Sequence, residues 1–255
     1  MKLEKIGVQL YTVRDYMNTK DDIKETFKKL KALGYDQVQT AGCKIPYDEF
    51  GAIAKESGLE IVGTHDSFEL MCTDFNTSLE NHKKLGTLNM GIGGYFKPTI
   101  EKNITFIEKA NMVAEKIAAH GGKFTYHNHH EEFIVLENGK TTMDMLVEGL
   151  NPEGTSFVLD TFWVQKGGSD VRYWIEKLSG RIDILHLKDM KVQMNESVFE
   201  QVFAEIGNGN LYWEGILETA LNTGVKYFVV EQDKCSENPF KSLEISSNYL
   251  HKNFM

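Results

Sequence analysis

The sequence has few cysteines, no long apolar run and no excess of positive charge. Its 255 residues include only Cys43, Cys72 and Cys235, too few and too widely spaced for a disulfide framework or a CxxC zinc site. A membrane-spanning helix needs about 20 consecutive apolar residues, and no stretch approaches that length. The net charge is -9 and the basic residues are scattered, so the electrostatics of a nucleic-acid binder are missing. The expected partner is a small solute, with neither a membrane nor a nucleic acid.

The N-terminal segment is not expected to be a targeting signal. MKLEKIGVQLYTV is too short and too mixed for a secretory signal peptide, because Arg14 and Asp15 directly follow its apolar part. Together with the few cysteines, this predicts a cytoplasmic protein, provided that no leader was removed from the chain.

Nucleotide-binding motifs, linkers and low-complexity tracts are also missing. There is no GxGxxG after the first apolar run and no GxxxxGK[ST], which removes the usual reason to expect a nucleotide-binding open sheet. Without a Pro-rich hinge or a visible repeat, the sequence predicts one domain over residues 1–255.

Short apolar runs alternate with amphipathic segments from end to end. Strands are expected at 6–11, 37–42, 60–65 and 87–93 and near 125, 158, 185 and 229. Helices are expected between them, including 47–56, 100–120, 141–150, 169–179, 212–222 and 238–250. Eight such units over this length predict an α/β fold, a closed (β/α)8 TIM barrel.

Four of the expected strands end on a polar residue that can bind a metal: His127, Asp160, His186 and Glu231. Because parallel strand ends meet at one rim of a barrel, these side chains predict a site for one divalent ion. Carboxylates favour Mn²⁺ or Mg²⁺ and imidazoles favour Zn²⁺ or Co²⁺, so the ion stays open. The structural alternatives are a helix-capping role for Asp160 and a core position for His186.

Further polar and aromatic residues are expected near this rim. In YHNHHEEF, His127 and His129 would share a strand face, so either could act as a base, and Glu132 could fold back from the loop. Lys188 could neutralise a developing oxyanion, or it could simply pair with Asp189 or another carboxylate. The substrate contacts expected at other strand ends are Tyr11, His65 and Trp163.

The segments GVQLYTVRDYM, YHNHHEEF, LDTFW, HLKDM, GNGNLYWEGIL and VVEQD occur in this order. In this combination the chain resembles the sugar phosphate isomerase/epimerase family, which has the xylose isomerase-like TIM barrel. The resemblance covers nearly the whole chain and implies one divalent metal, bound through Glu, Asp, His and Glu.

By this resemblance, Asp160, His186 and Glu231 match the last three ligands. The first ligand does not match, because Tyr126-His127 stands where the epimerases carry a glutamate. Either His127 replaces that glutamate or Glu132 supplies the fourth ligand, and Glu132 is the interpretation favoured here.

The resemblance implies an isomerase or epimerase that acts on a sugar or sugar phosphate through an enediolate. The missing strand-five glutamate keeps two alternatives open: a metal-dependent dehydratase or hydratase of a keto-sugar or inosose, and a non-catalytic sugar-binding barrel. The negative charge opposes a DNA endonuclease of the same fold. Many barrels of the family pair as dimers or tetramers, so a homo-oligomer is compatible with the sequence.

Overall fold

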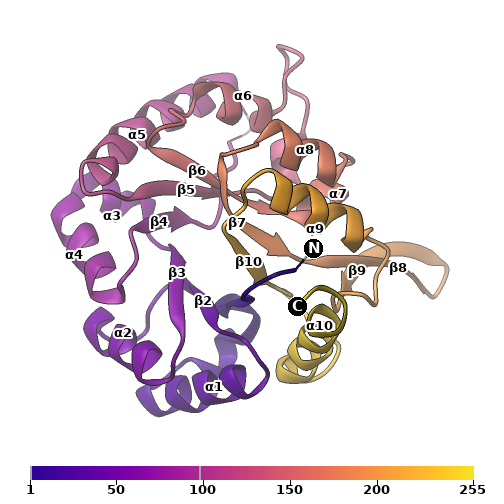
Figure 1. Ribbon diagram of the computed structural model, residues 1–255. Coiled ribbons are helices and arrows are strands. Elements are labelled where there is room, and N and C mark those ends of the chain that lie inside the picture. Colours follow the sequence, from indigo (N-terminus) through magenta and orange to yellow (C-terminus); the bar gives the residue numbers. More distant parts are fainter. Residues whose placement is uncertain (1, 98) are drawn as a thin grey trace.

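The computed structural model describes residues 2–97 and 99–255, and eight parallel strands at its centre are surrounded by helices (Figure 1). The strands are β1 (Gly7–Gln9), β2 (Gln37–Ala41), β3 (Glu60–His65), β4 (Asn89–Ile92), β5 (Lys123–His127), β6 (Thr155–Asp160), β7 (Ile182–Leu187), β8 (Asp189–Asn195), β9 (Val198–Ala204) and β10 (Tyr227–Val230). The helices are α1 (Lys20–Ala32), α2 (Tyr47–Glu56), α3 (Phe68–Thr73), α4 (Phe75–Leu85), α5 (Ile100–Ala118), α6 (Thr142–Gly149), α7 (Thr161–Lys166), α8 (Val171–Lys177), α9 (Trp213–Asn222) and α10 (Pro239–Phe254), with 3-10 helices at Leu10–Tyr16 and Glu131–Phe133.

The strand order around the ring follows the chain. It runs β3-β2-β1-β10-β7-β6-β5-β4, and every pair in this sheet is parallel. The two chain ends meet where β1 pairs with β10, through Gly7 beside Val229 and Val8 beside Val230. This arrangement confirms the predicted (β/α)8 barrel. None of the helices within residues 2–97 and 99–255 combines the length and the hydropathy that a membrane-spanning segment requires.

The ring is nearly closed, and side chains bridge the seam between β3 and β4. Asn89 Nδ2 donates to Val62 O (2.8 Å), and the Gly91 backbone amide donates to Thr64 Oγ1 (3.2 Å). A Cβ at residue 91 would collide with the Thr125 hydroxyl and with the Thr64 carbonyl oxygen. Glycine at this position therefore lets β4 approach both neighbouring strands closely.

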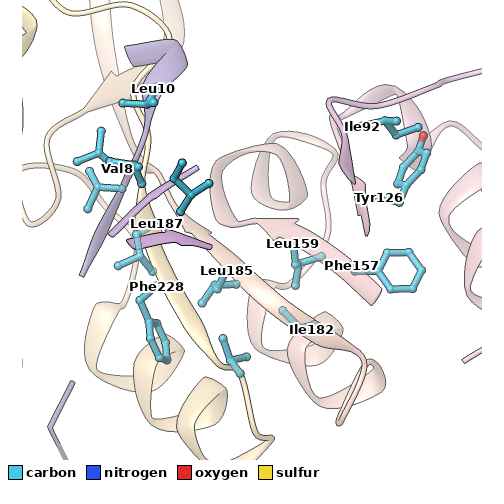
Figure 2. Packing of buried hydrophobic residues seen from close by; sticks show 14 of the residues in the cluster. Val8, Leu10, Ile92, Tyr126, Phe157, Leu159, Ile182, Leu185, Leu187 and Phe228 are labelled. Carbon is cyan, nitrogen blue, oxygen red and sulfur yellow. The ribbon is translucent and has the colours of Figure 1, made fainter. Parts of the chain in front are cut away.

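Apolar layers on both sides of the strands hold the ring together. Figure 2 shows part of the outer layer, where residues such as Leu185 and Phe228 pack between strands and helices. Inside the ring, a smaller layer consists of Val62, Val158, Ile184 and Val229. Because side chains alternate between strand faces, residues two positions later on these strands also face the interior. This alternation directs the side chains at the C-terminal ends of β6, β7 and β10 toward the centre of the barrel.

Local sequence signals set the starts of several helices. The Thr19 hydroxyl accepts a hydrogen bond from the Asp22 amide, and the Asp22 carboxylate accepts one from the Thr19 amide, which is a capping box before α1. Thr141 and Asp144 form the same box before α6. These reciprocal bonds satisfy N–H groups that a helix start otherwise leaves without partners.

Two parts of the chain differ from the expectation. The first strand ends at Gln9 and not at Tyr11, because the Gln9 side chain accepts from the Tyr11 amide (3.2 Å) and starts a 3-10 turn. After β7 the chain forms an antiparallel hairpin, β8–β9, where only a loop was expected. The hairpin projects beyond the ring of helices at the right of Figure 1.

The buried carboxylate of Asp189 anchors the base of this hairpin. It accepts hydrogen bonds from the amides of Met190 (2.8 Å), Gly207 (2.9 Å), Gly209 (3.1 Å) and Leu211 (3.2 Å) and from Trp213 Nε1 (2.7 Å). A Cβ at residue 209 would collide with this carboxylate. The HLKDM and GNGNLYW segments are therefore two halves of one structural clamp.

We expect Asp189→Asn to lower the free energy of unfolding by about 3 kcal/mol, because an amide cannot accept from all these donors and loses the charge that strengthens each bond. Urea denaturation followed by circular dichroism measures the change. Glu200→Gln, on the exposed face of the same hairpin, is the matched control and should stay within about 0.5 kcal/mol. Equal losses of unfolding free energy for the two substitutions would contradict the stabilising role of Asp189 in this clamp.

Candidate metal centre

The alternation of side chains along the strands brings four potential ligands together at the C-terminal end of the barrel strands. Asp160 and His186 are paired neighbours on β6 and β7, two residues beyond interior Val158 and Ile184. His127 ends β5, and Glu231 follows β10 two residues after interior Val229. All four side chains are buried, and one potential ligand atom from each lies within 4.8 Å of the others.

The shortest approaches within this cluster join imidazole nitrogens to carboxylate oxygens. His186 Nδ1 lies 3.0 Å from Glu231 Oε2 and 3.6 Å from Asp160 Oδ2. His127 Nε2 lies 3.3 Å from the same Asp160 oxygen. The other oxygen, Asp160 Oδ1, accepts from the Trp163 amide (3.0 Å) and caps α7. Asp160 therefore combines the helix-capping role with a place in the cluster.

A buried lysine completes the charge balance. Lys188 Nζ lies 3.0 Å from Asp160 Oδ2, 2.8 Å from Glu231 Oε2 and 2.9 Å from Asp233 Oδ1. Burial alone would lower the pKa of Lys188, but these carboxylates outweigh it and raise the pKa. With the carboxylates ionised, three negative charges face one positive charge. The remaining charge of -2 is what a divalent cation would neutralise.

Burial and charge also set the state of the ligands. Burial alone would raise the pKa of Asp160 and Glu231, but attraction to Lys188 and the imidazoles holds both pKa values well below the usual range. Burial lowers the pKa of His127 to about 4. Ionised carboxylates and a neutral imidazole are the forms that bind metals.

The cluster fits a divalent metal by its unsatisfied atoms as well as by its charge. His186 Nδ1 and Glu231 Oε2 are buried and lie 3.0 Å apart without hydrogen-bond geometry, and the contact of Lys188 Nζ with this oxygen (2.8 Å) is an ion pair rather than an aligned hydrogen bond. Buried polar atoms without partners cost free energy. Two imidazoles with two carboxylates suit Mn²⁺, Co²⁺ or Zn²⁺, and a cation between these atoms would satisfy them.

A pair of glutamines supports the cluster from below. His186 Nε2 lies 2.5 Å from Gln39 Oε1, and Gln9 Nε2 donates to the same oxygen (3.1 Å). An amide oxygen accepts hydrogen bonds only, so Nε2 of His186 carries a proton and Nδ1 is the nitrogen that faces Asp160 and Glu231. Burial alone would lower the pKa of His186, but these carboxylates raise it, and a metal at Nδ1 would take the place of the second proton. The glutamines thus select the tautomer that can bind a metal through Nδ1.

We expect Gln39→Leu to weaken metal binding about 10- to 100-fold, because loss of a partner that orients a metal-binding histidine typically has this effect. Competition with a fluorescent chelator measures the affinity directly. Gln37→Leu is the matched control on the same strand: Gln37 is also buried but donates to Glu60 (2.9 Å), away from the cluster. Unchanged affinity in Gln39→Leu would show that His186 needs no such orientation.

The structure does not bring Glu132, the favoured fourth ligand, to this cluster. Its carboxylate accepts from the Tyr126 hydroxyl (2.7 Å) and from the His129 amide (2.8 Å), and so it secures the loop after β5. His127 stands beside Asp160 instead. Because Tyr126 on β5 and His129 in the following loop already donate to Glu132, the geometry favours His127, the other candidate, and the ligand set stays a prediction.

The cluster opens into a cavity of about 530 Å³ at the rim of the barrel. Predicted residues that line it are Tyr11, His65, His127, His129, Lys188 and Glu231. Trp163, the remaining predicted contact, stacks on the ring of His130 (centroids 5.1 Å apart) and does not line the cavity. Lys188 pairs with Asp160, Glu231 and Asp233 rather than with neighbouring Asp189.

Several residues of the site were missed from the sequence. Gln9 and Gln39 are polar residues at interior positions of apolar strands, and that conflict was a usable signal. Asp66 and Asp233 also line the cavity. Asp66 follows the end of β3 and accepts from the Tyr47 hydroxyl (2.8 Å), a long-range contact without a sequence signal.

Comparisons with known proteins agree with this fold. An inosose dehydratase of Geobacillus thermodenitrificans is 27% identical over 57% of this chain. The match spans only about half (53%) of the length of that relative. An inosose dehydratase of Mesomycoplasma hyopneumoniae is 26% identical over 98% of this chain and 96% of its own length. A solved sugar phosphate isomerase/epimerase from Parabacteroides distasonis superposes with a TM-score of 0.82 at 21% identity, covering 98% of this chain and 95% of that one. Residues 27–250 match the sequence profile of the xylose isomerase-like TIM barrel family, and the chain belongs to that family.

Proposed function

We propose that this protein is a metal-dependent lyase that eliminates water beside the carbonyl group of a cyclic keto-polyol or keto-sugar. The observation that carries the proposal is the asymmetry of the clustered residues where they face the cavity. Of the four clustered residues, Glu231 offers the cavity a carboxylate and His127 offers an imidazole. Epimerisation by two metal-bound glutamates would need a second carboxylate in the place of His127. One carboxylate base suits a proton transfer on one side of the substrate.

The proposed roles follow from position. His127, Asp160, His186 and Glu231 would hold a divalent ion, which would supply Lewis acidity toward the carbonyl oxygen. Glu231 removes the proton from the carbon beside the carbonyl, and Lys188, 2.8 Å from Glu231, stabilises the enolate by its positive charge. His129 lines the same cavity and donates a proton to the departing hydroxyl, which leaves as water. His65 and Tyr11 would contact substrate hydroxyls.

The named relatives support this proposal. The three curated relatives are all named inosose dehydratase, at 26–27% identity. An inosose is a cyclic keto-polyol, and its dehydration is the elimination described above.

A sugar isomerase or epimerase is the second candidate. Its support is His129, whose ring centroid lies 4.8 Å from that of His127, so the cavity offers a second proton carrier beside the metal cluster. Both reactions pass through the same enolate, but an isomerase or epimerase returns the proton to carbon and retains the hydroxyl.

The test is to strip metals with a chelator, restore Mn²⁺, Co²⁺, Mg²⁺ or Zn²⁺ singly, and offer an inosose and a panel of ketoses and aldoses in deuterium oxide. We expect an enone absorbance and loss of water from the keto-polyol, both absent after chelation and restored by one ion. Deuterium on carbon without loss of water would assign the isomerase or epimerase. Metal-independent sugar binding without turnover would assign a non-catalytic barrel.

A further inference from the structure

The β8–β9 hairpin exposes an apolar face. Its register places Val192 and Met194 on the same face as Phe199, since Met194 lies opposite Phe199. Their side chains are 58%, 67% and 73% exposed. Large apolar side chains that lie together on an exposed surface typically mark a contact site, because burying them against a partner would stabilise the complex.

The same face packs at its base against aromatic residues next to Lys188, which lines the candidate site. Phe203, opposite Met190 in the register, stacks on Phe162 with ring centroids 4.2 Å apart. It also lies 5.7 Å from the ring of Trp163 and 5.6 Å from Lys188 Nζ. The apolar face therefore runs from the metal cluster outward to the exposed hairpin tip.

The two edges of the hairpin differ in how they are covered. Near the base, Asn210 covers the outer edge of β8: its amide donates to Met190 O (2.6 Å) and its side chain accepts from the Val192 amide (3.3 Å). Within residues 2–97 and 99–255, no strand pairs with the outer edge of β9. An open edge next to an apolar face is a template for another strand.

The sequence of β9 shows which strand fits. In VFEQVFA, Phe199 and Phe203 are placed symmetrically about Gln201, and Glu200 and Val202 flank it. If two copies pair antiparallel about Gln201, each Phe199 lies beside the partner's Phe203. Each Glu200 lies beside the partner's Val202, so no like charges oppose each other.

We propose that β9 pairs with β9 of a second copy of this chain, which gives a two-fold dimer with a continuous four-stranded sheet. Such self-complementary contacts are the usual basis of two-fold homodimers. The partner's Phe199 then extends the aromatic wall that Phe203 begins beside Lys188. This inference does not depend on the reaction proposed above.

Sedimentation across a range of protein concentrations tests the dimer. We expect a wild-type dimer, and at least a roughly 30-fold weaker dimer affinity for Phe199→Glu, as for loss of an interface hot spot. The matched control is Tyr173→Glu on α8, where the side chain is 54% exposed, and it should leave the dimer intact. A monomeric wild type, or a dimer that survives Phe199→Glu, would overturn the proposal.

Cross-linking locates the two-fold axis independently of any loss of association. In a Cys72→Ser background, which removes the exposed cysteine, Gln201→Cys should form a disulfide with its own copy under mild oxidation. Gln193→Cys, an equally exposed glutamine of the same hairpin on β8, should not. Equal cross-linking of both, or none at position 201, would exclude pairing about Gln201.

Discussion

Glu231→Gln is expected to lower kcat/KM for the keto-polyol by about 10³-fold, the middle of the range for loss of a general base. The substitution retains the size of a side chain that is 5% exposed. It removes both the proton acceptor and the negative charge beside Lys188 and His186. Steady-state rates with saturating metal measure the effect, so that weaker metal binding is not mistaken for slower chemistry.

The matched control for this substitution is Glu205→Gln. Glu205 is also a glutamate in a partly buried network, where it accepts from the Ser242 hydroxyl (2.8 Å), but it does not line the cavity. Its replacement should leave the rate within about twofold, because a surface-network change usually costs under 0.5 kcal/mol. If Glu231→Gln kept more than a tenth of the wild-type rate at saturating metal, Glu231 would not be the base.

Asp160→Asn is expected to abolish stabilisation of the fold by metal. At a metal concentration 100 times its dissociation constant, binding raises the stability of the wild type by about 2.7 kcal/mol. The asparagine still caps α7 through its carbonyl oxygen but directs an NH₂ group toward His127 and Lys188, in place of the carboxylate oxygen. The metal-free variant should therefore remain folded while its Tm no longer rises with added Mn²⁺ or Zn²⁺.

Thermal unfolding with and without each ion, together with elemental analysis of the purified protein, measures this effect. Asp183→Asn is the matched control. Asp183 is also buried, but it pairs with Lys123 and Lys226 at the other end of the barrel. It should change the metal-free Tm and leave the metal-induced rise intact. A full metal-induced rise in Asp160→Asn would remove Asp160 from the ligand set.

The fold and the strand-end cluster were predictable because both depend on periodic patterns. Apolar runs that stop on His127, Asp160, His186 and Glu231 imply a common rim once the strands are parallel. The orientation of Glu132 was not predictable, because it depends on how the loop after β5 meets the Tyr126 hydroxyl. A loop conformation of this kind leaves no periodic trace in the sequence.

The hairpin was missed for a different reason. Its strands carry Lys191, Gln193 and Glu200 between apolar residues and are joined by Glu196 at a positive φ of 54°. Such a mixture is typical of a solvated loop, and a barrel of eight strands was already complete without it. What fixes the hairpin is the contact of Asp189 with a segment about 20 residues later.

The seam between β3 and β4 determines where this ring can be cut. The two ends of the described chain lie side by side (Figure 1), with the Leu3 amide donating to Phe254 O (2.6 Å), and the strands next to them form a ladder. Between consecutive β3 and β4 there is no ladder among the described residues, and the seam is joined by side-chain hydrogen bonds and by one backbone bond, from the Asp66 amide to Gly91 O (2.8 Å). The junction between Leu3 and Phe254 is thus not the weakest point of the ring. A circular permutant can therefore begin before β4, end after α4 and join Phe254 to Leu3 through a short linker. Such a chain keeps every parallel ladder of the barrel. The order of the chain and the architecture of the barrel are thus separable in this protein.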